Sequence, residues 1–258
     1  VKYGTARDAV LGLKAVTGTG ETITVGARTT KSVVGYDLTR LLIGSEGTLA
    51  VITEATLRLL PRPPRRQLLR AAYQDIEAAA AAVARIMQQP ALPSALELMD
   101  ADAVQLAFAY LGEQQPAASA QAVPTNTGAL LLIEADGDDE TLPGSVRAIA
   151  AAAAGHGLLE WRAAADGHEA EALWACRNAL SPSLRRLAPK KVNEDVAVPV
   201  TRLPALFGGL RALSQSHGLR IVCFGHAGNG NIHVNILANP DDPAQLMQIE
   251  TCLHAVFQ

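Results

Sequence analysis

A proline- and arginine-rich segment divides this chain into two parts. Residues 61–66 read Pro-Arg-Pro-Pro-Arg-Arg. Closely spaced prolines cannot continue a central strand or a helix, because each one lacks a backbone N–H and has a fixed φ. With 258 residues, the chain is long enough for two modest domains. We therefore predict a domain boundary here, with one domain over residues 1–62 and a second over 63–258.

The two parts differ in their pattern of apolar residues. Before the break, the sequence predicts strands at 9–16, 22–25 and 49–60, with a helical turn or two at 35–43. After it, strands are predicted at 67–72, 96–99, 129–135, 157–162, 192–198, 219–224 and 232–237, and helices at 76–88, 101–111, 142–155, 168–187 with an interruption at Pro182, 203–217 and 243–257. This alternation predicts an α+β fold in which an antiparallel sheet carries helices on one face.

The segment Gly225–Asn235 predicts a hairpin that brings two histidines together. Asn229-Gly230 favours a two-residue type I′ turn, which would pair His226 directly with His233 at a Cβ separation of about 5 Å. Two imidazoles at that distance can bind one divalent ion if further ligands come from elsewhere. The alternative is a hairpin whose histidines cap a sheet edge or bond to the backbone. Asn235 shares their face.

Composition excludes several classes of protein. The chain is 49% hydrophobic and 18% charged with a net charge of −3, which favours a folded core and gives no sign of a nucleic-acid partner. The three cysteines, Cys176, Cys223 and Cys252, have no C-x-x-C spacing and are expected to be buried thiols in a reducing compartment. No apolar run reaches the roughly 18 residues that span a bilayer. We predict a cytoplasmic protein and leave peripheral membrane attachment open.

Two further motifs carry chemistry. The run Gly44-Ser45-Glu46-Gly47-Thr48 has the composition of a loop whose backbone approaches a phosphate or sugar, although a simple turn is the alternative. In the helix predicted over 168–187, Arg177 and Ser181 are four residues apart and share one face. A guanidinium beside a hydroxyl suits recognition of a carboxylate, against the alternative of a surface arginine. Pro182 is expected to bend the helix at its own position.

Several runs, in the same order along the chain, resemble one flavoprotein family. These are residues 2–8, 11–13, 35–49, 51–54 and 194–199, together with the histidine hairpin. They are similar to the flavin-dependent D-2-hydroxy-acid dehydrogenases of the vanillyl-alcohol-oxidase-type superfamily, which include glycolate oxidase flavoprotein subunits, D-lactate dehydrogenases and D-2-hydroxyglutarate dehydrogenases. The resemblance implies the C-terminal portion of an FAD-binding domain over 1–62 and a substrate-binding cap domain over 63–258.

The same resemblance implies a set of FAD contacts. Gly44, Ser45, Glu46, Gly47 and Thr48, with the backbone near Val51 and Ile52, would contact the phosphates, ribose or adenine of FAD. Tyr3 and Gly4 would lie near the flavin. Because the chain opens without a methionine, in mid-domain, we expect a fragment that lacks the main pyrophosphate loop.

The resemblance also implies a substrate site. Arg177 and Ser181 would hold the substrate carboxylate, and Asn235 would help orient the substrate. Asn193 stands where the D-2-hydroxyglutarate enzymes place a lysine, which favours a monocarboxylate such as D-lactate or glycolate, although Lys190 or Lys191 could serve a second carboxylate. His226 and His233 would bind a divalent metal such as Zn, Fe or Mn.

The function implied is oxidation of a D-2-hydroxy acid to the 2-oxo acid with hydride transfer to FAD. In this family the third metal ligand and the base lie in a later Gly-Glu-His-Gly segment, so we expect no catalytic base before Gln258 and an inactive isolated fragment. The electrons would pass to an acceptor protein or a quinone, and a homodimer is left open. Two alternatives stand beside this hypothesis: a metal-independent flavin oxidoreductase of the same superfamily, and a non-catalytic cap or interaction module.

Overall fold

A computed structural model describes residues 1–258 except 28, 30, 32–33, 115–122, 189 and 240. The chain forms two compact units, Val1–Arg62 and Pro63–Gln258. The division falls inside the proline-rich segment, at residues 61–64, which belong to neither a helix nor a strand. Each unit has its own sheet.

The first unit is a small three-stranded antiparallel sheet with strand order β2-β1-β3. Its elements are α1 (Ala6–Ala9), β1 (Val10–Thr17), β2 (Thr22–Gly26), α2 (Leu38–Leu42) and β3 (Ala50–Leu57). The apolar side chains of β1 meet those of α2 in a core formed by Leu13, Ala15, Val25, Leu42 and Ala50. The strand predicted over 49–60 ends at Leu57, three residues early.

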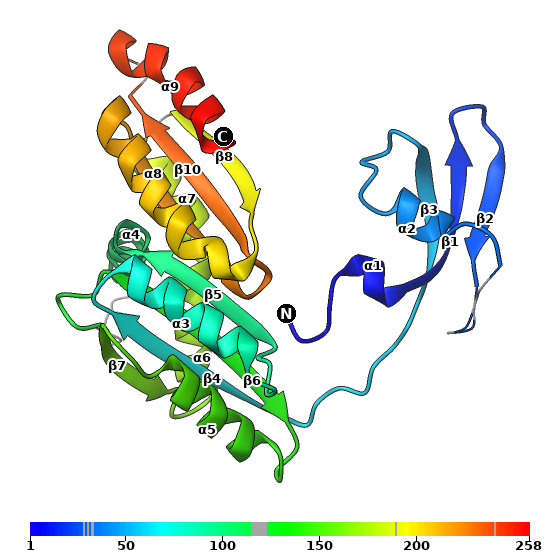
Figure 1. Ribbon diagram of the computed structural model, residues 1–258, viewed down its shortest axis with the longest axis horizontal. Coiled ribbons are helices and arrows are strands. Elements are labelled where there is room, and N and C mark those ends of the chain that lie inside the picture. The colour runs from blue at the N-terminus through cyan, green and yellow to red at the C-terminus, as the bar shows by residue number, and fades with distance from the viewer. Residues whose placement is uncertain (28, 30, 32–33, 115–122, 189, 240) are drawn as a thin grey trace. The chain divides into compact units, whose positions relative to one another are not determined.

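The second unit is built on a seven-stranded sheet with strand order β7-β4-β6-β5-β9-β10-β8 (Figure 1). Every recorded strand pairing in it is antiparallel. The strands are β4 (Arg65–Tyr73), β5 (Ala95–Asp100), β6 (Ala129–Gly137), β7 (Leu158–Ala163), β8 (Lys190–Ala197), β9 (Arg220–His226) and β10 (Asn231–Ala238). The helices are α3 (Ile76–Gln88), α4 (Ala101–Gln114), α5 (Leu142–Ala153), α6 (Gly167–Asn178), α7 (Leu180–Leu187), α8 (Leu203–His217) and α9 (Pro243–Val256), with single 3-10 turns η2 (Val200–Arg202) and η3 (Ala227–Asn229).

The α+β class is confirmed, but the prediction that helices cover one face of the sheet is wrong. Leu68 of β4 and Leu132 of β6 belong to one buried apolar cluster with Leu180 of α7 on one face. On the other face, the Tyr73 hydroxyl donates to the Ala153 carbonyl at the end of α5, 2.8 Å away. The central strands β4, β5 and β6 are buried on both sides, so both faces need cover.

The long helix predicted over 168–187 is two helices that meet at Ala179. Proline has no N–H to donate to the carbonyl four residues before it, and its ring clashes with that carbonyl. For Pro182 this carbonyl is that of Asn178, the last residue of α6. The interruption therefore lies one turn before the proline, not at Pro182 as predicted.

The three cysteines are buried free thiols, as predicted. Burial raises the pKa of the Cys176 thiol to about 11. Within the described residues, no helix combines the length and the apolar character that crossing a bilayer requires.

Candidate functional site

The hairpin that carries the two histidines has a four-residue loop. Asn231 pairs with His226 and His233 pairs with Phe224, so the predicted direct pairing of His226 with His233 is wrong. Residues 227–229 form the 3-10 turn η3, and only Gly230 in this loop has a left-handed backbone, with φ of 71°. A bond from the Val198 N–H to the Gly230 carbonyl, 3.0 Å, ties the loop to the end of β8 and favours this register.

The two histidines nevertheless meet. His226 lies opposite Asn231, and His233 is two residues further along the same strand, so both point to the same sheet face as diagonal neighbours. Their ring centroids are 5.3 Å apart, with an interplanar angle of 79°. The prediction of two adjacent imidazoles survives the change of register because the shift is an even number of residues.

Each histidine is oriented by a carboxylate on the neighbouring strand. His226 Nδ1 lies 2.5 Å from Glu97 Oε1 of β5, and His233 Nδ1 bonds to Asp195 Oδ1 of β8. A carboxylate only accepts hydrogen bonds, so each imidazole donates from Nδ1, and in its neutral form it carries its lone pair on Nε2. This is the arrangement that commonly supports a metal-ligating histidine.

Arg177 joins the same cluster from helix α6. Its Nε donates to Glu97 Oε2 at 2.7 Å, and both side chains are largely buried, 15% and 8% exposed. The guanidinium carbon lies 4.9 Å from the ring centroid of Phe224, which is 5.4 Å from the ring of His233. Because the recorded hydrogen bond uses Nε, the two terminal nitrogens of the guanidinium fork are available for another bidentate partner.

The remaining predicted substrate residues are placed as follows. Asn235 of β10 is fully buried and lies on the same sheet face. Its partner on the adjacent strand β8 is Asn193, which is exposed. The Nδ2 of Asn235 donates to the carbonyls of Val222 and His233, and its Oδ1 is a buried acceptor without a partner among the described residues. Ser181 is exposed on α7, beyond the break, and so does not share a continuous helix with Arg177.

Three members of this cluster were missed from the sequence: Glu97, Asp195 and Phe224. Glu97 had a signal, because a single carboxylate within the apolar run 96–99 must find a partner if the strand is buried. Asp195 had none, since only the strand order brings β8 beside β10. Phe224 lies on a predicted hairpin arm, but it faces His233 only in the observed register.

The cluster can be tested against the metal that the resemblance implies. Across the described part of the chain, no three or more His, Cys, Asp or Glu side chains are gathered to hold a metal ion. The chain therefore offers two nitrogen ligands, Nε2 of His226 and of His233, with both Nδ1 atoms already bonded. Such a pair fits part of a coordination sphere whose other ligands come from elsewhere.

In the first unit, the segment Gly44–Thr48 is an exposed or half-exposed loop between α2 and β3. Gly44, Glu46 and Gly47 all have left-handed φ values, of 87°, 51° and 78°. For Glu46 this is a strained conformation, and such strain is concentrated at ligand-binding loops. The N–H groups of Ser45 and Thr48 donate to the carbonyls of Leu42 and Ser45. The exposed glycine-rich backbone of such a loop can still approach an anion such as the phosphates of FAD closely. Ile52 and Tyr3 expose 43% and 41% of their surface, and Gly4 has φ of 77°.

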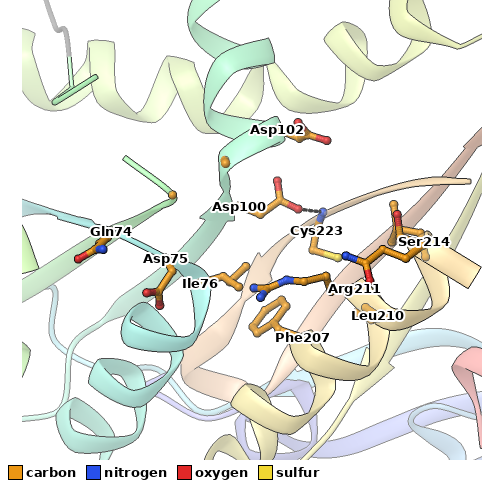
Figure 2. A pocket seen from close by; sticks show the side chains of 14 residues that line it. Gln74, Asp75, Ile76, Asp100, Asp102, Phe207, Leu210, Arg211, Ser214 and Cys223 are labelled. Carbon is orange, nitrogen blue, oxygen red and sulfur yellow. Dashed lines mark hydrogen bonds between the residues drawn. The ribbon is translucent and has the colours of Figure 1, made fainter. Parts of the chain in front are cut away.

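A separate cavity of about 410 Å³ lies on the opposite face of the large sheet, between α3 and α8 (Figure 2). None of the predicted site residues lines it. Beside it, the Asp100 carboxylate accepts from the N–H groups of Ala103 and Cys223, at 2.7 and 2.5 Å. Burial nevertheless raises the pKa of Asp100 to about 7.

Curated relatives of the chain include glycolate oxidase subunits, D-lactate dehydrogenases and a D-2-hydroxyglutarate dehydrogenase. The chain is 33% identical to the glycolate oxidase subunit GlcD of Bacillus subtilis over 260 residues, covering 100% of the chain and 53% of that protein. It is 32% identical to the D-lactate dehydrogenase of Anaerostipes hadrus over 240 residues, covering 93% of the chain and 50% of that protein. The chain thus spans about half the length of the curated relatives it matches.

Solved structures support the fold. The chain superposes on p-cresol methylhydroxylase with substrate bound at a TM-score of 0.70 and 12% identity, covering 96% of this chain and 55% of that one. The family described as FAD linked oxidases, C-terminal domain, matches residues 62–258, which make up most of the chain. The chain therefore belongs to the FAD-linked oxidases, within the FAD-linked D-2-hydroxy-acid dehydrogenase family to which its sequence pointed.

Proposed function

We propose that the protein containing this chain oxidises a D-2-hydroxy acid of the D-lactate or glycolate type to its 2-oxo acid, with FAD as the hydride acceptor. The observation that carries this proposal is the cluster on one sheet face, where Arg177 lies beside two imidazoles. Each imidazole is hydrogen-bonded to its own carboxylate. A 2-hydroxy acid has a carboxylate and a hydroxyl on neighbouring carbons, and the cluster offers one cationic fork and two ring nitrogens.

Arg177 would bind the substrate carboxylate. Its Nε is anchored by Glu97, which fixes the plane of the fork, and the ring of Phe224 supports one side of the guanidinium. A planar fork held in this way gives bidentate recognition at low entropic cost. Asn235 would help orient the substrate, because its Oδ1 can accept a hydrogen bond from a hydroxyl or from an ordered water. Ser181 remains a proposed second donor to the carboxylate.

The two histidines would hold a divalent cation next to the substrate hydroxyl. Nε2 of His226 and of His233 are the ligands that this chain supplies. When bound, the cation supplies a positive charge that lowers the pKa of the hydroxyl. The acidic partners Glu97 and Asp195 hold each ring in place.

The first unit, residues 1–62, would be part of the FAD-binding domain, and residues 63–258 the substrate-binding cap domain. The loop Gly44–Thr48, with Tyr3, Gly4 and Ile52, would contact the cofactor. FAD, when bound, supplies the redox chemistry of the reaction.

The substrate class is proposed to be a monocarboxylate. Asn193 is neutral and exposed, and by the resemblance it stands where the D-2-hydroxyglutarate enzymes place a lysine for the second carboxylate. Lys191 is on the same face of β8, two residues away. Because a neutral amide stands where the resemblance implies a cation for a second carboxylate, we expect a dicarboxylate to bind less well than D-lactate.

The test uses the purified full-length protein and its visible spectrum. Flavin absorbance should be present, and anaerobic addition of D-lactate or glycolate should bleach it, whereas L-lactate and the carboxylate-free alcohol 2-propanol should not. A spectrum without flavin would contradict the proposal and favour a non-catalytic cap module. Flavin that no 2-hydroxy acid reduces would also contradict it.

The cation is tested separately from the flavin reaction. His226→Ala protein should lose bound metal and most of its turnover with D-lactate while keeping its flavin. Normal turnover in this variant would refute the metal-assisted mechanism and favour a metal-independent flavin oxidoreductase of the same superfamily.

A further inference from the structure

A single buried carboxylate connects the two halves of the proposed substrate site. Glu97 lies on β5 one residue before Leu98, which pairs with Gly225, and so it stands across from His226. Oε1 of Glu97 is 2.5 Å from His226 Nδ1, and Oε2 is 2.7 Å from Arg177 Nε. One side chain thus contacts both a proposed cation ligand and the proposed carboxylate-binding arginine.

The burial of Glu97 limits which contacts its carboxylate can exchange. Glu97 retains 6% of its exposure, and a carboxylate buried to that degree is stable only when its oxygens are paired. Here each oxygen has its own hydrogen-bond partner, so releasing either one would leave a buried acceptor unpaired, and releasing Arg177 would also leave the buried charge uncompensated. The second histidine differs, because Asp195 is 59% exposed in its side chain and contacts His233 at the surface.

We propose that Glu97 is a positioning residue that couples recognition of the substrate carboxylate to the state of His226. This proposal rests on the proposed function for the roles of Arg177 and His226. Glu97 fixes the guanidinium plane through Oε2 and, through Oε1, keeps the His226 proton on Nδ1. The lone pair of Nε2 then remains available to a cation.

Glutamine at this position separates the two roles. The Arg177 guanidinium only donates, so it requires the amide oxygen of Glu97→Gln. The amide NH₂ group is then forced to face His226 Nδ1, which becomes an acceptor and moves the ring proton to Nε2. Arg177 keeps its anchor, whereas His226 loses the lone pair that a cation needs.

The experiment uses full-length holoenzyme and its Glu97→Gln variant at one fixed pH. Histidine-selective ¹⁵N NMR, with the His226 signals identified by their absence from His226→Gln protein, should show the Nδ1–H tautomer in the wild type and the Nε2–H tautomer in the variant. Zn²⁺, added to metal-stripped protein, should bind the variant about 10–100-fold more weakly. With D-lactate, kcat should fall while KM stays within about twofold.

Glu97→Ala and Asp195→Asn complete the set. Glu97→Ala removes both anchors and should raise KM as well as lower kcat. Asp195→Asn is the matched control on His233: its exposed amide is free to rotate and present its oxygen, so the ring should keep the proton on Nδ1 and Zn²⁺ affinity should change less than threefold.

The outcomes distinguish this proposal from the proposed function. An Nε2–H tautomer in wild-type protein, or an unchanged tautomer and Zn²⁺ affinity in Glu97→Gln, would overturn the role of Glu97 even if D-lactate reduces the flavin. A KM rise in Glu97→Gln equal to that in Glu97→Ala would also overturn it. If no 2-hydroxy acid reduces the flavin, the proposed function fails, while the wild-type tautomer still decides how Glu97 orients His226.

Discussion

The two faces of the seven-stranded sheet use neighbouring residues for different purposes. Glu97 and Leu98 are consecutive in β5, and the alternation of a strand sends their side chains to opposite faces. Glu97 enters the ionic cluster with Arg177 and His226, whereas Leu98 is fully buried on the face that carries α3 and α8. The same strand therefore supplies site residues on one side and packing on the other.

The faces also differ in how their buried acids are satisfied. On the site face, Glu97 has a cationic partner within 2.7 Å. On the cavity face, the Asp100 carboxylate accepts from two backbone N–H groups, and burial raises its pKa. We expect substitutions on the site face to change binding and turnover, and substitutions on the cavity face to change stability.

The largest expected effect is on the packed face. Leu98→Ala removes a side chain with 0% exposure and should lower the free energy of unfolding by about 2–5 kcal/mol, because it leaves a cavity. Urea denaturation measures this, and the KM for D-lactate should not change. Leu187→Ala, at a position 39% exposed, is the control and should cost well under half as much. A changed KM in Leu98→Ala with little loss of stability would contradict the expectation that this face of the sheet serves packing and not substrate binding.

The second effect is a pH dependence of stability that comes from Asp100. Its pKa is raised in the folded state from 3.8 to about 7, so the folded protein binds the proton more tightly than the unfolded chain does. The contribution to stability is fully present below about pH 4 and is lost as the pH rises towards 7, at up to about 1.4 kcal/mol per pH unit. The stability of the wild type relative to Asp100→Asn should fall across this window. A difference that stays flat, or that grows with pH, would contradict the assignment.

The third effect is on the site face. Arg177→Lys keeps the charge but loses the planar fork, so kcat/KM for D-lactate should fall by about tenfold, mainly through KM. Arg186→Lys is a matched control, since Arg186 also pairs with a glutamate, Glu113, and stacks on a ring, that of Tyr110. It lies in α7 and is half exposed, so its replacement should leave the kinetics unchanged. Equal losses in the two variants would mean that Arg177 acts through folding alone.

The smallest effect separates the observed hairpin from the predicted one. A type I′ turn would need positive φ at Asn229, but this residue is in a 3-10 turn and is exposed. Asn229→Ala should therefore change stability by less than about 0.5 kcal/mol. Gly230→Ala should cost clearly more, because φ is 71° and a Cβ would lie 1.9 Å from the Val198 carbonyl oxygen. Similar losses for both would favour the type I′ turn.

Much of the fold was predictable because local signals agree with the tertiary structure. Helix α3 was predicted to its observed bounds, since Asp75 caps its first turn through the Ala78 N–H. The position of the helix break was not predicted correctly, because proline acts on the carbonyl one turn earlier. The uninterrupted apolar run at 130–133 was a signal for a strand buried on both faces, and it was the reason that one layer of helices was not enough.

The sequence alone determined which residue types are present at the site and, for the histidines, that they share a face. Strand periodicity is a local property, so it survives an error of two residues in register. Only the tertiary structure decided what orients those histidines, because Glu97 is 129 residues from His226 along the chain and Asp195 is 38 residues from His233. Hydrogen bonds between such distant residues depend on the strand order, which places β5 beside β9 and β8 beside β10 and which no local pattern in the sequence encodes.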